Sequence, residues 1–137
     1  LKNLENSINR WNERYQTVES MLTKIRGIEV PQRLSEERYV GSSIQFRIPG
    51  ITMSEADLFI NKNKKLGVEL KWFGNDDPSG FTSNHKSWKY VSQQQLNKSD
   101  DILSSLFDLR LPLTFSIDDC IHLSKIIIEC SNDFIKK

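Results

Sequence analysis

The sequence has no large excess of charge and no long apolar segment, and these two absences exclude several classes of protein. Nineteen Lys and Arg residues are balanced by eighteen Asp and Glu residues, for a net charge of +1. Proteins that bind nucleic acid or anionic membranes usually carry a broad basic surface. No apolar run approaches the roughly 20 residues of a membrane-spanning helix, and the N-terminal residues lack the layout of a signal peptide. We therefore expect a soluble, cytoplasmic protein that binds neither nucleic acid nor a membrane.

Cysteine and histidine are scarce, which leaves little material for a disulfide or a metal site. Cys120 and Cys130 lie ten residues apart in one predicted helix, a rise of about 15 Å, so they cannot bridge each other. Cys120 and His122 are two residues apart, and on a helix such side chains point about 200° apart. We expect two reduced cysteines and no metal site.

The usual sequence patterns of catalysis are also missing. There is no glycine-rich phosphate loop and no G-x-S-x-G nucleophile motif. The aspartate pairs at 100–101 and 118–119 lie at predicted helix starts and the pair at 76–77 lies in a turn, where capping explains them. His85, in a long polar loop, could act as an acid or base near neutral pH, or could simply be solvated. We place no catalytic residue in this chain.

Apolar residues recur at spacings of three and four near the N-terminus, which predicts a long amphipathic helix over residues 1–26. These residues are Leu1, Leu4, Ile8, Trp11, Tyr15, Val18, Leu22 and Ile25. The stripe fits a helix lying on its own domain, which the bulky Trp11 and Tyr15 favour, or a coiled-coil seam between chains. The chain begins with Leu1 inside this pattern, without methionine or a start signal, so we expect a piece of a longer polypeptide.

The remaining sequence alternates between strand and helix patterns. We expect strand 40–48, helix 53–66, strand 68–73, polar loop 74–88, a short helix after Ser99, strand 109–113 and a last helix from residue 117. Helix caps are predicted at Thr52 or Ser54, at Ser99, and at Ser116 together with Asp119. We interpret residues 1–137 as a single domain of the α/β (α+β) class. Its core, 40–135, is a two-layer sandwich of three or four strands with helices on one face, preceded by the long helix.

The stretch LRLPLTFSIDD, residues 109 to 119, contains an arginine that needs an explanation. Leu109, Leu111 and Leu113 alternate as in a half-buried strand, which puts Arg110 and Pro112 on the opposite face. A guanidinium group matches a carboxylate or phosphate through two parallel hydrogen bonds, and a strand would hold it rigidly. Arg110 is therefore a candidate anion-binding residue. The alternative is an ion pair with an acid of the same chain.

Three stretches resemble the C-terminal region of pyridoxal-phosphate aminotransferases of the DegT/StrS group. They are GVELKWFG at 67–74, GFTSNHKSWKY at 80–90 and DLRLPLTFSIDDC at 108–120. The resemblance covers about residues 40–130, and the leading helix is similar to the helix that links the two domains of such enzymes. The resemblance implies the fold of the aspartate aminotransferase superfamily.

The resemblance also implies a function. In such enzymes a large domain, with the lysine that holds pyridoxal phosphate (PLP), precedes a small C-terminal domain, so this chain resembles the small domain and is expected to be inactive alone. Arg110 occupies the position of the arginine that binds the substrate carboxylate, which implies an amino acid or keto acid substrate. Trp72, Phe73 and His85 are possible lining residues. The implied partners are the protein's own large domain and, for the full-length enzyme, a second copy in a homodimer.

Two other functions stay open from the sequence. A freestanding small-ligand-binding or regulatory α/β module would use the same sheet without chemistry. A helix-mediated oligomerisation domain would use the apolar stripe of residues 1–25, and burial of Trp11 and Tyr15 between chains would favour it.

Overall fold

The computed structural model describes residues 3–77, 85–90, 92 and 94–135. Four α-helices, three strands and one 3-10 helix follow each other along these residues. They are α1 (Leu4–Leu22), β1 (Ser43–Arg47), α2 (Met53–Lys65), β2 (Leu70–Trp72), η1 (His85–Ser87), α3 (Asn97–Ser104), β3 (Leu106–Arg110) and α4 (Ile117–Ser131).

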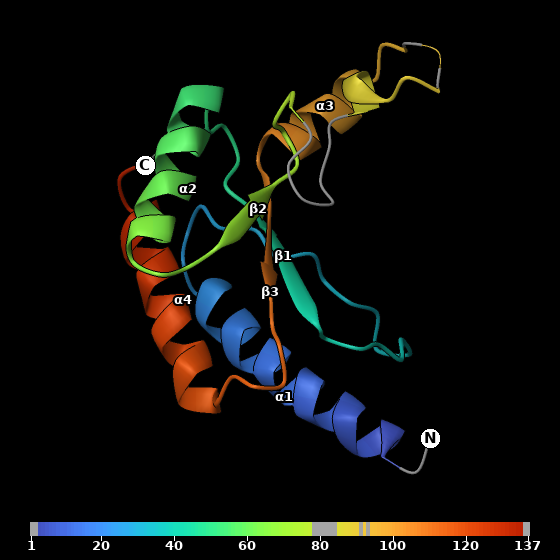
Figure 1. Ribbon diagram of the computed structural model, residues 1–137, viewed down its shortest axis with the longest axis vertical. Coiled ribbons are helices and arrows are strands. Elements are labelled where there is room, and N and C mark those ends of the chain that lie inside the picture. Colours follow the sequence, from blue (N-terminus) through green and yellow to red (C-terminus); the bar gives the residue numbers. More distant parts are fainter. Residues whose placement is uncertain (1–2, 78–84, 91, 93, 136–137) are drawn as a thin grey trace.

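The three strands form one antiparallel sheet in the order β1-β3-β2, so the last strand of the chain is the central one. Ser43 of β1 lies opposite Arg110 of β3, and Leu70 of β2 lies opposite Leu109. Helices α1, α2 and α4 lie on one side of the sheet (Figure 1). The predicted two-layer arrangement, with a small sheet and helices on one face, is confirmed.

The core lies between the sheet and these helices and is built around three phenylalanines. Phe46 of β1, Phe59 of α2 and Phe107 of β3 are fully buried. The ring centroids of Phe59 and Phe107 are 5.0 Å apart at an interplanar angle of 70°, an edge-to-face contact that aromatic pairs favour. Phe46 contacts both rings, so a single aromatic cluster joins two strands to α2.

The C-terminal half of α1 packs on its own domain. Tyr15, Val18 and Leu22 are buried, and α1 packs against α4 and β1. Gly41 approaches the helix so closely that a Cβ atom there would lie 2.4 Å from Tyr15 Cβ, so only glycine fits without a shift. Leu4, in the first turn, is 49% exposed. The interpretation of the stripe as a helix on its own domain therefore holds for this half.

Two predicted helix boundaries are wrong. Helix α1 ends at Leu22 rather than residue 26, because the backbone bonds that follow, from the Ile25 N–H to the Leu22 carbonyl and from the Ile28 N–H to the Ile25 carbonyl, span three residues instead of four. Helix α3 begins at Asn97 with Leu96 as its N-cap, so Ser99 does not cap it. The other two caps are confirmed: Thr52 with Glu55, and Ser116 with Asp119, form capping boxes at α2 and α4.

Several sequence expectations concern features other than the fold. None of the helices in the described residues is long and apolar enough to cross a membrane. Within the same ranges, no three His, Cys, Asp or Glu side chains gather as a metal site would require. Cys120 and Cys130 are free and buried, and burial raises the pKa of both thiols. Residues 78–84 of the long polar loop lie outside the described residues.

Candidate functional site

The face of the sheet that α1, α2 and α4 leave uncovered, here called the outer face, carries polar and charged side chains. Because side chains alternate along a strand, Asp108 and Arg110 of β3 share this face. The register places Ser43 opposite Arg110, and places Gln45 and Lys71 on either side of Asp108. The outer face therefore presents a compact set of ionic and hydrogen-bonding groups on three paired strands.

Arg110 is the last residue of β3 and is exposed, whereas Leu109 and Leu111 on either side of it are buried. The predicted alternation therefore holds at this position. Within the part of the chain that the structure describes, the Arg110 guanidinium has neither an ion pair nor a side-chain hydrogen bond. The alternative explanation of Arg110, an ion pair with an acid of the same chain, finds no partner among these residues.

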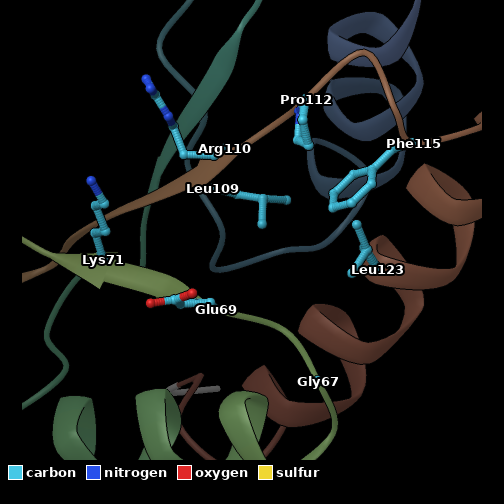
Figure 2. A pocket seen from close by; sticks show the side chains of 8 residues that line it. All are labelled: Gly67, Glu69, Lys71, Leu109, Arg110, Pro112, Phe115 and Leu123. Carbon is cyan, nitrogen blue, oxygen red and sulfur yellow. The ribbon is translucent and has the colours of Figure 1, made fainter.

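A pocket of about 320 Å³ opens beside Arg110, between β2, β3 and the first turns of α4. It is lined by Gly67, Glu69, Lys71, Leu109, Arg110, Pro112, Phe115 and Leu123. Figure 2 shows that Arg110 and Lys71 extend away from the apolar side chains of Leu109, Phe115 and Leu123. The pocket thus has an apolar wall and a charged rim, and the two cations belong to the outer face.

Trp72 and Phe73, two of the predicted lining residues, differ in position: Trp72 ends β2 and Phe73 lies in the turn that follows it. Trp72 is 6% exposed and its indole Nε1 donates a hydrogen bond to the Ser104 carbonyl at 2.8 Å. It therefore belongs to the inner face, opposite the side chain of Arg110. Phe73 follows β2, is half-buried, and donates its backbone N–H to the Leu106 carbonyl.

His85, the third predicted lining residue, belongs to a separate polar cluster. Its Nε2 lies 2.6 Å from Asp100 Oδ1, and Lys86 Nζ lies 3.4 Å from Asp100 Oδ2. The hydrogen bond with His85, and then the charge of Lys86, hold the pKa of the Asp100 carboxyl below its usual value. Helix α3, which His85 contacts through Asp100, lies at the end of the sheet where β3 begins (Figure 1), whereas Arg110 is the last residue of β3, so the structure does not bring His85 and Arg110 together.

Arg14, which the sequence places among the polar residues of the long helix, is buried instead. Its Nε donates to the Phe115 carbonyl at 2.7 Å, and its Nη1 and Nη2 donate to the carbonyls of Arg10 and Leu113. The arginine therefore fixes the loop between β3 and α4, which forms one side of the pocket. Arg14 lies next to the apolar stripe of the long helix in the sequence, but the spacing of the apolar residues does not distinguish it from the solvated polar residues of the same helix.

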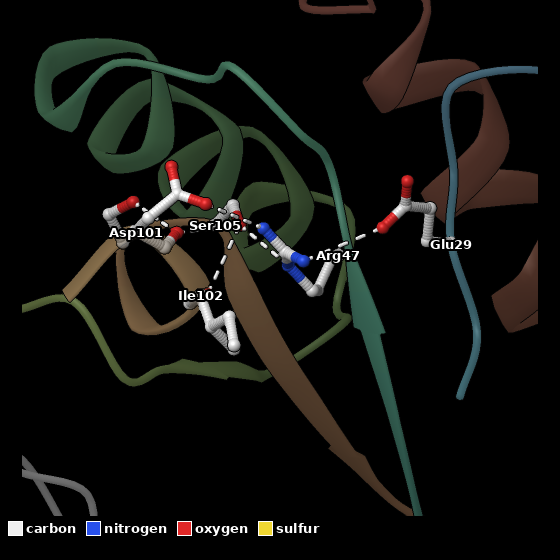
Figure 3. A network of polar contacts seen from close by, with 6 residues as sticks. Glu29, Arg47, Asp101, Ile102 and Ser105 are labelled. Atoms are coloured by element: carbon white, nitrogen blue, oxygen red, sulfur yellow. Dashed lines mark hydrogen bonds and ion pairs between the residues drawn. The ribbon is translucent and has the colours of Figure 1, made fainter. Parts of the chain in front are cut away.

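Arg47, at the end of β1, ties three further segments together (Figure 3). Its Nε donates to Ser105 Oγ at 2.9 Å, and its two Nη atoms lie 3.6 Å from Glu29 Oε2 and 3.5 Å from Asp101 Oδ2. Ser105 is buried and in turn donates to the Ile102 carbonyl. This network holds α3 against the sheet, so its role is structural.

A second pocket, of about 310 Å³, lies beside β1 and is more polar. The Arg33 guanidinium lies over the rings of Tyr15 and Tyr39, 4.8 and 4.2 Å from their centroids, and forms an ion pair with Glu37 at 2.6 Å. Cation–π contacts of this kind hold a loop against a helix. Because Glu37 balances the charge of Arg33, this pocket carries no excess charge for an anion.

Comparison with solved structures identifies proteins that contain the same fold. The aminotransferase TlmJ from Streptoalloteichus hindustanus matches with a TM-score of 0.78 and 14% identity, over 96% of this chain and 34% of that chain. A putative sugar aminotransferase, Spr1654 from Streptococcus pneumoniae, matches with a TM-score of 0.77 and 14% identity, over 96% and 32%. 3-Amino-5-hydroxybenzoic acid synthase matches with a TM-score of 0.73 and 16% identity, over 96% and 36%. No protein-family model and no curated protein matches the sequence.

These matches cover nearly the whole chain but about a third of each solved structure. The chain therefore has the fold of one domain of these aminotransferases. The resemblance stated from the sequence, to aminotransferases of the DegT/StrS type, is confirmed at the level of the fold.

Proposed function

We propose that this chain is the small C-terminal domain of a PLP-dependent aminotransferase and that it supplies the residue that binds the substrate carboxylate. The observation that carries the proposal is the combination of two facts. The chain superposes over 96% of its length on parts of aminotransferases. Arg110 stands exposed on the uncovered face of its sheet, without an ion pair in the described residues.

The environment of Arg110 suits the binding of a carboxylate. The residue ends the central strand of the sheet: its backbone pairs with Ser43 of β1, and the preceding residue, Leu109, pairs with Leu70 of β2. A guanidinium offers a carboxylate two parallel N–H donors, each charge-assisted bond contributing about 1.5 to 3 kcal/mol. These bonds orient the substrate for chemistry carried out by groups elsewhere. The substrate is accordingly an amino acid or a keto acid.

The residues beside Arg110 suit a substrate better than the cofactor. Lys71 is the lysine that lines the pocket, and its side chain extends away from the apolar wall instead of being enclosed. We infer that PLP, which supplies the electron sink for removal of the substrate's α-proton, is held by a large domain of the same polypeptide. That large domain, and a second copy in a homodimer, are the partners we propose.

The isolated chain tests whether substrate binding and PLP binding are divided between two domains. Mixed with PLP and reduced with borohydride, it should show weak labelling spread over surface lysines and no transamination of amino acids. The native polypeptide, measured by mass spectrometry, should be longer and carry a PLP-binding domain before Leu1. Stoichiometric labelling of one lysine with turnover by the chain alone would contradict the proposal. So would a native polypeptide without such a domain, which would favour the freestanding ligand-binding module.

A further inference from the structure

Asp108 is a nearly buried acid in the centre of the outer face, and the proposed function gives it no role. It lies two residues before Arg110 on β3 and is 6% exposed. Buried carboxylates are almost always hydrogen-bonded or paired, because removing a charge from water is costly. In the described part of the chain, however, Asp108 has no side-chain hydrogen bond and no ion pair. Its position therefore calls for a donor from outside these residues.

The carboxylate oxygens of Asp108 remain accessible although most of the residue is covered. Among the described side chains, the one fully buried polar atom without a hydrogen-bond partner is Asn63 Oδ1. Since Asp108 also lacks such a partner, its oxygens must keep some contact with solvent. Gln45 and Lys71 lie directly across the sheet on either side of it. Asp108 is thus a hydrogen-bond acceptor on the outer face, between Gln45 and Lys71 of the neighbouring strands.

The charges around Asp108 select the kind of donor. Arg110 shares its face on β3, and Lys71 lies opposite it on β2, so two cations flank one acid. An ammonium group at the far end of the ligand would have to lose its water at this nearly buried site beside the guanidinium of Arg110, whereas a neutral hydroxyl loses its water at a lower cost. A hydroxyl can donate a hydrogen bond to Asp108 without bringing a further positive charge beside Arg110.

We propose that Asp108 determines substrate specificity by accepting a hydrogen bond from a hydroxyl group of the carboxylate-bearing substrate that Arg110 holds. The inference rests on the proposed function, since Arg110 must bind the carboxylate for the hydroxyl to reach Asp108. The substrate class is therefore a hydroxylated amino or keto acid. Asp108 acts as a specificity residue and takes no part in bond making or breaking.

A titration of the 15N-labelled chain with two matched acids tests the inference. Butyrate offers a carboxylate alone, and 4-hydroxybutyrate adds a hydroxyl at the far end of the same chain. The backbone amides of Ser43 and Arg110 report binding by NMR. We expect 4-hydroxybutyrate to bind at least about threefold more tightly than butyrate, a discounted value for a charge-assisted hydrogen bond in a partly solvated site. 4-Aminobutyrate should bind more weakly than 4-hydroxybutyrate.

Variants of Asp108 separate a ligand contact from a structural role. Asp108→Val suits a strand and should bind both acids equally, whereas Asp108→Asn keeps a carbonyl acceptor and should keep part of the preference. Asp57→Asn, an exposed acid on α2, removes the same charge and should change nothing. Equal binding of the two acids by the wild type, a preference that survives in Asp108→Val, or tighter binding of 4-aminobutyrate would overturn this inference alone. Failure of both acids to bind near Arg110 would overturn the proposed function with it.

Discussion

Arg110 is an exposed residue of the candidate site and Arg14 is a buried structural residue, and only the position of Arg110 could be predicted from the sequence. The strand predicted at 109–113 is misplaced, because β3 spans Leu106–Arg110. The alternation around Arg110 still correctly predicts that this residue faces away from the core, since Leu109 and Leu111 are buried. Arg14 differs because its burial depends on a loop 99 residues or more away, whose carbonyls it reaches. Local spacing carries no information about such a contact, so Arg14 could not be distinguished from solvated residues of the same helix.

Removing the Arg14 side chain should destabilise the domain. Arg14→Leu deletes the donors to the Phe115 and Leu113 carbonyls; Leu113 keeps its bond from Arg10 Nη2, but the Phe115 carbonyl loses the Arg14 Nε donor. We expect a loss of about 2–3 kcal/mol in the free energy of unfolding, measured by urea titration. Arg26→Leu, at an exposed position after α1, should change stability by less than about 0.5 kcal/mol. Equal effects of the two substitutions would refute the structural role of Arg14.

Asp100 should titrate below the ordinary range of an aspartate. The pKa of Asp100 is lowered mainly by its hydrogen bond with His85. Because the folded pKa lies below the unfolded one, this pair stabilises the fold above about pH 4, and the contribution is lost as the pH falls toward the folded pKa. 13C NMR of the Asp100 carboxyl should show its pKa rising in His85→Leu. The pKa of Asp119, lowered by its bonds with Ser116, should stay where it is; a parallel shift at both sites would point to a global change instead.

Among the structural elements, the helices with a complete cap signal were predicted best. Ser116 followed three residues later by an acid predicts the start of α4, and Thr52 followed by Glu55 marks the start of α2. Ser99 gave a misleading signal, because α3 begins at Asn97 after an uncapped Leu96. A serine alone indicates a helix start weakly, since the same residue is tolerated in the first turn.

The two serines therefore make a matched pair of cap variants. Ser116→Ala removes the acceptor for the Asp119 N–H and should cost about 1 kcal/mol of unfolding free energy, with a rise in the pKa of Asp119. Ser99→Ala should cost less than about 0.5 kcal/mol, because Ser99 caps nothing. Urea unfolding of both variants checks the difference. A larger loss for Ser99→Ala than for Ser116→Ala would mean that the helix starts have been wrongly assigned.

Helix α1 should show two halves of unequal importance. Leu22 is fully buried against the domain, so Leu22→Ala should lower stability by about 2–5 kcal/mol. Leu4 is 49% exposed, and Leu4→Ala should cost less than about 0.5 kcal/mol. Thermal unfolding should measure both losses of stability. Sedimentation should show the same oligomeric state for the wild type and for both variants. A dissociation caused by Leu4→Ala would instead favour the coiled-coil interpretation of the stripe.

For the whole molecule, the sequence was sufficient to predict the layers but not the surroundings of the candidate site. Inward residues at 44, 46, 68, 70 and 72 fix which face of the sheet is covered. The pairing of β3 between β1 and β2 joins residues 35 to 67 positions apart in the sequence, which local patterns do not determine. For this reason the proximity of Lys71 and Asp108 to Arg110, and the separation of His85 from it, became evident only in the folded chain.

The central claim, that Arg110 binds the substrate carboxylate, is tested most directly in the longer polypeptide to which we assign this domain. The amino-donor half-reaction should be measured for the wild type, Arg110→Lys and Arg110→Ala, with Arg26→Ala as an exposed control. Lysine keeps the charge but loses the paired donors, so catalytic efficiency should fall further in alanine than in lysine. We predict a roughly ten- to hundredfold loss for each charge-assisted bond removed, with little change in unfolding free energy. An unchanged half-reaction in Arg110→Ala, or unfolding of the domain by that substitution, would contradict the claim.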